Sequence, residues 1–141
     1  MVEICRVKTD CEMKLVHEIR TEVFVREQGV PVELEMDELD GGAVHVIAFV
    51  DGMPAGCARM LLNGEEAKIG RVAVKKNMRR YGIGTGICKL LLTIAKDEGV
   101  RKIYVGSQLT AVDFYSTMGF EKQGDAYMEA GIAHVKMARS I

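Results

Sequence analysis

The chain has 141 residues, with 19 Lys and Arg against 20 Asp and Glu, and 48% of its residues are hydrophobic. This length fits one domain spanning residues 1–141, which buries roughly two thirds of the surface that the unfolded chain exposes. The balanced charge and the lack of a long apolar run argue against a nucleic-acid partner, a membrane partner and a secretion signal, so we expect a cytoplasmic protein that acts on small molecules.

The first third of the chain predicts a strand, a helix and a loop. Residues 2–9 alternate apolar and polar side chains, as in a half-buried strand, and residues 10–28 change to the spacing of an amphipathic helix. Residues 28–42 then combine one proline, three glycines and many acids. This composition predicts a loop that contains at most a short turn of helix.

The middle and the end of the chain predict six further strands and two helices. Residues 43–74 read as three antiparallel strands joined by an Asp-Gly and an Asn-Gly turn. A helix over 84–100 ends near Gly99, a strand follows, and a short helix stops at Gly119. Residues 120–140 form two more strands around a glycine-containing loop. This order predicts an α/β (α+β) domain with a mixed sheet.

The cysteines and histidines are scattered along the chain and give no spacing typical of a metal site. We expect the thiols to be reduced, small, buried side chains and not disulfides or nucleophiles. We likewise expect no metal cofactor. The residues concerned are Cys5, Cys11, Cys57, Cys88, His17, His45 and His134.

The segment RRYGIGTG, residues 79–86, places three glycines and two arginines ahead of the helix over 84–100. A helix N-terminus has unpaired backbone N–H groups and a partial positive charge, and glycines let a phosphate approach them closely. Lys75 and Lys76 add two cations just before the segment. The pattern therefore predicts a site for a pyrophosphate or polyphosphate.

Other glycine loops fit this segment less well. After Gly86 the chain reads ICK, so the lysine and hydroxyl residue of a P-loop are missing. Gly82, Gly84 and Gly86 follow each other at every second position, which does not match the dinucleotide fingerprint. A helix start with solvated basic residues beside it is the simplest alternative.

Arg79, Gly82 and Gly84 match the pattern of Arg or Gln followed by xxGxG, after a strand that reads GRVAV. A later segment reads AVDFYSTMGF. With these two motifs the chain resembles the GNAT superfamily of N-acetyltransferases. The segment RTEVFVREQGVPVELEMDELD and the ending GIAHVKM further resemble the ElaA and YjcF subgroup, and this ending also resembles glyphosate N-acetyltransferase.

The resemblance implies a fold and a co-substrate. The GNAT fold has a mixed, mostly antiparallel central sheet of roughly six to seven strands flanked by helices, and the family uses acetyl-CoA as the acetyl donor. The strand before the loop would contact the pantetheine arm, the loop would bind the pyrophosphate, and two aromatic residues and a glutamine would complete the site. The implied residues are Val72, Ala73, Val74, Arg79, Arg80, Tyr81, Gly82, Ile83, Gly84, Thr85, Gln108, Phe114 and Tyr115.

The resemblance also implies an acid and a base for direct attack by an amine on acetyl-CoA. Tyr115 occupies the position of the family's tyrosine, which protonates the leaving thiolate; its other interpretation is a packed core side chain. His134 lies on the polar side of the alternation in IAHVKMA. By resemblance to glyphosate N-acetyltransferase it would accept the proton of the ammonium group, whereas a lone histidine is commonly structural.

The expected acceptor is a primary amine of a small metabolite, and two arginines imply that it is anionic. Arg20 and Arg71 match residues that hold an anionic substrate in glyphosate N-acetyltransferase, while a third arginine of that enzyme is replaced here by Gln108. Six acids between residues 27 and 40 are interpreted as mainly solvent-facing charges, with Glu27 or Glu33 as a second candidate base.

Three further readings stay open on the sequence. The chain could acetylate a protein or peptide, it could bind coenzyme A as a regulator without turnover, or it could belong with the acyl-homoserine lactone synthases, which the segment RTEVF resembles faintly. The C-terminal strands are expected at a sheet edge, which favours a homodimer.

Overall fold

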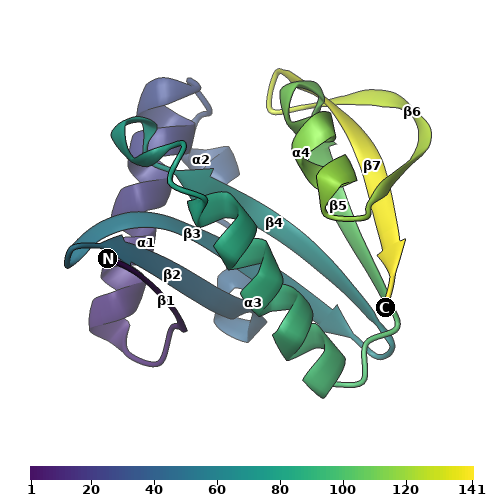
Figure 1. Cartoon of the computed structure of the whole chain (residues 1–141). Helices are drawn as coiled ribbons and strands as arrows, with labels where there is room; N and C mark the ends of the chain where they lie inside the picture. The colour runs from purple at the N-terminus through teal and green to yellow at the C-terminus, as the bar shows by residue number, and fades with distance from the viewer.

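The computed structural model describes all 141 residues, and its seven strands form one sheet in the order β1-β2-β3-β4-β5-β7-β6 (Figure 1). Neighbouring strands are antiparallel except β4 and β5, which are parallel. The predicted mixed, mostly antiparallel sheet is therefore confirmed. The strands are β1 (Val2–Arg6), β2 (Val44–Val50), β3 (Met53–Asn63), β4 (Glu66–Val74), β5 (Lys102–Gln108), β6 (Glu121–Glu129) and β7 (Ile132–Ser140).

Four α-helices connect the strands, and the predicted helix over residues 10–28 is present in two parts. Helix α1 begins with a capping box between Thr9 and Glu12 and continues without a break into a π-helical segment, η1. No helix is long and apolar enough to cross a membrane. The helices are α1 (Asp10–Arg20), α2 (Val32–Glu35), α3 (Ile83–Asp97) and α4 (Val112–Thr117), with η1 (Thr21–Glu27) and short 3-10 turns at Glu38–Gly42, Lys76–Met78 and Leu109–Ala111.

The two predicted hairpin turns differ in detail. Asp51 and Gly52 both have positive φ, 48° and 81°, which is the type I′ geometry that an Asp-Gly pair favours. In the second hairpin Asn63 still pairs with Glu66 in the sheet, so Gly64 and Glu65 form the turn. Only Gly64 is in the left-handed region, which is the requirement of a type II′ turn.

Helices cover the sheet unequally. On one side, here called the α3 face, α3 and α4 pack against alternate residues of the strands, including Ile69, Ile103 and Met137. On the opposite side, the α1 face, α1 and η1 pack against β2, β3 and the end of β4 through Val16, Ile19 and their neighbours. No helix packs against the α1 face of β5, β7 and β6.

Strands β4 and β5 separate part-way along their length. Their pairing runs only from Glu66 and Lys102 to Ile69 and Val105, although both strands continue. Just beyond this point the pairing of β4 with β3 shifts register, and Arg71 has a φ of 51°. A bulge of this kind bends a strand away from its neighbour. The sheet is therefore open between the second halves of β4 and β5 (Figure 1).

The thiols fall into two groups. Cys57 and Cys88 are buried, and burial raises the pKa of both to about 12, so they are inert as predicted. Cys5 and Cys11 are exposed, so the expectation that all four are buried is wrong for this pair.

Candidate active site

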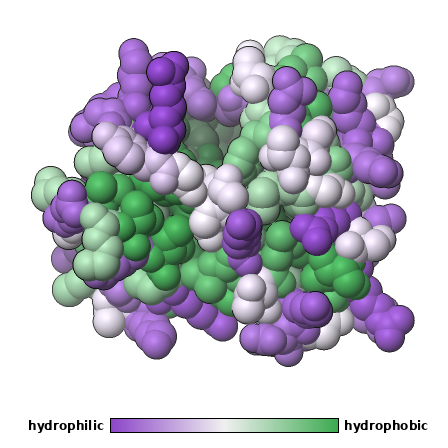
Figure 2. All heavy atoms as spheres, in the orientation of Figure 1, coloured by the Kyte–Doolittle hydropathy of each residue, from purple (hydrophilic) through white to green (hydrophobic).

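A cleft of about 970 Å³ occupies the opening between β4 and β5. Its mouth is visible as a hollow at the top of the molecule in Figure 2. The cleft brings together residues that lie far apart in the sequence, which include Arg71, Arg79, Gly84, Gln108, Tyr115 and His134. Because the opening passes between two strands, the α3 face and the α1 face both contribute to its walls.

The glycine turn places the N-terminus of α3 at this cleft. Gly82 precedes the helix with a φ of 73°, a conformation that glycine adopts without strain. No side chain caps the helix, and the bond from Gly86 N–H to the Gly82 carbonyl is the first one inside it. The N–H groups of Ile83, Gly84 and Thr85 are therefore left without intrahelical partners. The sequence predicts an anion site at these N–H groups.

The basic residues around the turn are mostly unpaired. Lys75, Lys76 and Arg80 make no ion pair, and the ring of Tyr81 is 62% exposed. Arg79 is the exception, because its two terminal nitrogens each donate to Glu27 over 2.8 Å and its Nε donates to the Val74 carbonyl. Three cations without an ion pair thus precede the start of α3 in the sequence.

Tyr115 reaches the cleft from α4 on the α3 face. Its ring packs edge-on against Phe114 and Phe120, with centroids 5.0 and 5.8 Å away, and only 6% of the residue is exposed. Burial raises the pKa of the phenol above its ordinary value. The phenol is therefore held in its protonated form at neutral pH, which a proton donor requires.

His134 reaches the cleft from β7 on the α1 face. Its Nδ1 lies 2.7 Å from the Ile132 carbonyl, which can only accept, so Nδ1 carries the proton in the neutral ring and Nε2 carries the lone pair. Nε2 lies 3.8 Å from a carboxylate oxygen of Glu129, and the ring stacks on Tyr127 with centroids 5.7 Å apart. The imidazole is thus fixed in orientation, and its Nε2 makes no hydrogen bond.

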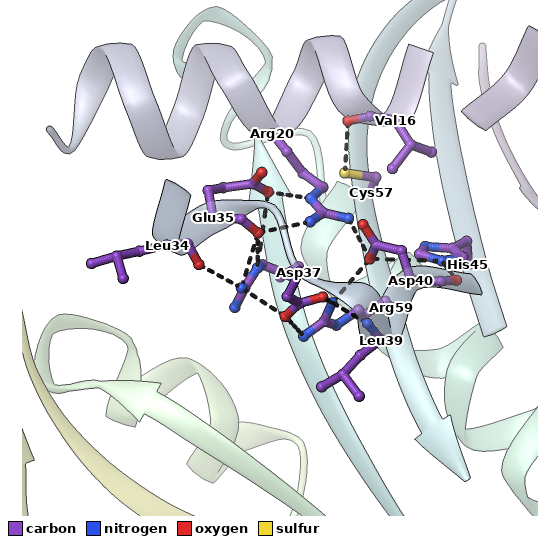
Figure 3. A network of polar contacts seen from close by, with 11 residues as sticks. Val16, Arg20, Leu34, Glu35, Asp37, Leu39, Asp40, His45, Cys57 and Arg59 are labelled. Carbon is purple, nitrogen blue, oxygen red and sulfur yellow. Dashed lines mark hydrogen bonds and ion pairs between the residues drawn. The ribbon is translucent and has the colours of Figure 1, made fainter. Parts of the chain in front are cut away.

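Arg20 belongs to a network of charges between α1, α2 and the sheet (Figure 3), and Arg71 joins this network through Glu35 and Asp37. Arg20 is 1% exposed; its guanidinium pairs with the Glu35 carboxylate and donates to Asp40 over 2.9 Å. Arg71 lines the cleft and donates to the Leu34 and Glu35 carbonyls and to Asp37. Arg20 therefore does not line the cleft in this structure, and Arg71 does.

Arg59, which no sequence motif singled out, is central to this network. Arg59 is 5% exposed and binds Asp37 through both terminal nitrogens, at 2.6 and 2.8 Å, and Asp40 at 2.9 Å. The sequence does contain a sign of this role, because Arg59 lies among apolar residues in a predicted strand. A charged side chain that is buried there requires an acidic partner. Figure 3 shows Arg20 and Arg59 converging on Asp40.

The acids of residues 27–40 are correspondingly not all solvent-facing. Glu35 is buried, and Asp37 and Asp40 are partly buried. Hydrogen bonds from Arg59 hold the pKa of Asp37 below its usual value. Burial alone would raise the pKa of Asp40, but the hydrogen bonds from Arg20 and Arg59 outweigh it and lower this pKa too. The interpretation of a solvated acidic rim is wrong for these three residues.

The remaining predicted residues line the cleft in part. Val72 and Val74 lie on the free part of β4 and contribute to the wall, whereas Ala73 points into the core beneath α1. Gln108 lies at the end of β5, opposite His134 in the register, and donates to the Gln28 side chain over 2.9 Å. Phe114 lies against Gly84, where an added Cβ would be 3.4 Å from its ring.

Residues 7–141 match the family model for an acetyltransferase (GNAT) domain. The chain belongs to the GNAT acetyltransferases. It is 33% identical to the uncharacterized N-acetyltransferase YjcF of Bacillus subtilis over 94% of this chain and 95% of that protein. It is 30% identical to the protein ElaA of Escherichia coli over 88% of this chain and 84% of ElaA.

Solved structures agree with this family membership. An acyl-CoA N-acyltransferase from Pseudomonas aeruginosa superimposes with a TM-score of 0.87 at 28% identity, over 99% of both chains. The crystal structure of Escherichia coli ElaA superimposes with a TM-score of 0.84 at 25% identity, also over 99% of both chains. The predicted fold and the predicted resemblance to ElaA and YjcF are therefore confirmed, and the chain is an acetyltransferase.

Proposed function

We propose that this GNAT protein transfers an acetyl group from acetyl-CoA directly to a primary amine of a small, anionic metabolite. One observation carries the proposal: the cleft crosses the sheet and holds a phenol from the α3 face and an imidazole from the α1 face. A group that protonates the leaving sulfur and a group that deprotonates the attacking amine are needed on opposite sides of the reacting carbonyl.

The donor side of the cleft fits acetyl-CoA. Three unpaired N–H groups at the start of α3 suit the pyrophosphate, and three cations without an ion pair, Lys75, Lys76 and Arg80, precede them closely in the sequence. The free edge of β4, Val72 to Val74, offers backbone groups to an extended pantetheine arm and to the thioester oxygen. Acetyl-CoA would supply an acyl group that is activated as a thioester.

His134 and Tyr115 carry the two proton transfers in this proposal. Nε2 of His134 accepts the proton of the ammonium group, directly or through a water, as the amine forms its C–N bond to the acetyl carbon. Tyr115 donates its hydroxyl proton to the departing sulfur when the C–S bond breaks. The nitrogen loses a second proton as it becomes the amide, and this proton restores the Tyr115 phenol, while His134 releases the ammonium proton to water. The products are therefore an amide, a thiol and one proton.

Arg71 is the residue proposed to contact an anionic group of the acceptor, because it lines the cleft and keeps a quarter of its side chain exposed. Arg20 is assigned a positioning role, since its Nη2 donates to the same Glu35 carbonyl that accepts from Arg71. It would hold the end of α2 in place and thereby orient Arg71.

The proposal is tested by measuring thiol release from acetyl-CoA with amino acids, amino sugars, polyamines and aminophosphonates. We expect turnover with at least one small amine. His134→Gln should lower kcat by about 10²-fold or more, and Tyr115→Phe by about 10-fold or more, because each removes one proton transfer. His17→Gln, on α1, is the control and should retain full activity.

The outcomes separate the alternatives. Turnover with peptides and not with small amines would show a protein acetyltransferase, and coenzyme A binding without turnover would show a regulator. Unchanged activity in His134→Gln would overturn the assignment of the base. Glu27→Gln and Glu33→Gln then test the two carboxylates that the sequence offered in its place.

A further inference from the structure

The α1 face of β5, β7 and β6 carries polar and aromatic side chains with no helix above them. Residues that pair directly across neighbouring strands share a face. The register pairs Lys68 with Tyr104, Gly106 with Lys136, and Gln108 with His134, and alternation places all of them on the side opposite α3 and α4. His134 thus shares one face with two lysines and a tyrosine.

A second cavity of about 490 Å³ lies on this face. Tyr104, Tyr127 and Lys136 line it, and it shares Leu61, Lys68, Val105 and Gly106 with the walls of the large cleft. The two cavities are therefore adjacent parts of one depression. A molecule that places its amine in the cleft can extend into the second cavity without crossing the sheet.

The second cavity is positively charged. Nζ of Lys136 lies 4.3 Å from the centroid of the Tyr104 ring, and Nζ of Lys102 lies 5.3 Å from it. Lys68 and Lys136 line the cavity and make no ion pair, whereas the only acid of the lining, Glu66, accepts a hydrogen bond from the Tyr104 hydroxyl over 2.8 Å. Two lysines against one glutamate leave one net positive charge beside the aromatic rings of Tyr104 and Tyr127.

Strand β7 sets the distance between Lys136 and His134. Lys136 follows His134 by two residues on β7, which corresponds to about 7 Å along the strand. Tyr127 lies between the two cavities: it stacks on His134, and its hydroxyl lies over Gly106, where an added Cβ would be 2.6 Å away. A side chain at position 106 would therefore displace the Tyr127 hydroxyl.

We propose that Lys136 and Lys68 form a second anion subsite for the acceptor, beyond the contact assigned to Arg71, and that it binds a carboxylate or phosphonate group roughly five bonds from the reacting nitrogen. This inference rests on the proposed function, because it takes His134 as the point where the amine binds. It identifies the acceptor class as amines that carry a remote anionic group and a short apolar chain between the two ends. Leu61, Tyr104 and Tyr127 contact that chain.

The test compares matched amines. 5-Aminopentanoate and 4-aminobutylphosphonate carry the anion, and 5-amino-1-pentanol replaces it with a neutral group. We expect the ratio of kcat/KM for 5-aminopentanoate to that for 5-amino-1-pentanol to exceed about ten, to fall several-fold in Lys136→Ala and to approach one in Lys136→Ala/Lys68→Ala. Lys89→Ala, an exposed lysine of α3, should leave this ratio unchanged. The phosphonate shows which anion is preferred.

Each result bears on the inference separately from the proposed function. If amines are acetylated but the ratio is near one, or is the same in Lys136→Ala, the subsite is refuted while the function stands. If no amine is acetylated, saturation-transfer NMR on 5-aminopentanoate decides the subsite alone. Binding that is lost in Lys136→Ala supports it, and binding that is absent or unaffected overturns it.

Discussion

The molecule contains two groups of basic residues close to one cleft, and they differ in what surrounds them. In the network of Arg20, Arg59 and Arg71, three acids and several backbone carbonyls occupy the guanidinium donors. Near the glycine turn, Lys75, Lys76 and Arg80 make no ion pair, and the N–H groups at the start of α3 have no intrahelical partners. The first group holds α2 against the sheet, while the second is free to bind an external anion. The presence of basic residues alone therefore does not identify an anion site. Hydrogen-bond donors that have no partner within the protein do.

The largest effect is expected on removing an arginine from the paired group. Arg20→Ala leaves Glu35, which is 3% exposed, without its main partner. Loss of one member of a buried ion pair costs about 3–5 kcal/mol of unfolding free energy. Urea denaturation measures this, with Arg26→Ala, an exposed arginine, as the matched control that should change stability by less than about 0.5 kcal/mol. Equal stability of both variants would contradict the comparison.

The paired group also makes stability depend on pH. The folded-state pKa values of Asp37 and Asp40 are lowered, so these carboxylates stabilise the fold fully above the ordinary aspartate pKa of about 3.9. That stability is lost as the pH falls below about 4 and through the lowered values. The urea midpoint should fall steeply from pH 5 to pH 3. In Asp37→Asn/Asp40→Asn the midpoint should be lower at pH 5 and should depend less on pH.

The unpaired group is expected to act on binding and not on stability. Arg80→Ala keeps the backbone near its φ of 74° but removes a free cation, so coenzyme A should bind about three- to tenfold more weakly. Calorimetric titration measures the Kd, and the difference should shrink at high salt because the contact is exposed. A large loss of stability in Arg80→Ala would show instead that Arg80 is a structural residue like Arg20 and Arg59.

The smallest effect is expected at Arg79, which belongs to the turn but is paired. Glu27→Gln removes the partner of its guanidinium, and an exposed pair of this kind contributes less than about 1 kcal/mol to stability. The freed guanidinium should raise the affinity for coenzyme A by about two- to fivefold. Weaker binding in Glu27→Gln would show instead that Glu27 must hold Arg79 in place for the ligand.

Much of the fold could be predicted because its signals are local. Alternation predicted β2, β3 and β4, and Gly99 and Gly119 marked where helices end. The π-helical part of the first long helix was not predicted, because its hydrogen bonds depend on how η1 packs and not on a distinct composition. The exposure of Cys5 also depends on tertiary context, since β1 is an edge strand with one open side.

The parts of the candidate site that belong to a sequence motif could be predicted. The residues whose position depends on ion-pair partners from another segment could not. The glycine turn, Tyr115 and His134 lie at the cleft that their motifs imply. The burial of Arg20 could not be read from its position, because its partners Glu35 and Asp40 come from a loop with no periodic pattern. The roles of the glycine turn in binding and of Tyr115 and His134 in catalysis stay predictions until the variants above are measured.

The separation of β4 from β5 also has a kinetic consequence for the proposed reaction. The donor would enter from the α3 face and the acceptor from the α1 face, so neither needs to leave before the other binds. A ternary complex then forms in any order, and double-reciprocal plots should intersect. A desulfo analogue of coenzyme A should compete with acetyl-CoA and not with the amine. An inhibitor that links both substrates would have to pass through the opening between β4 and β5.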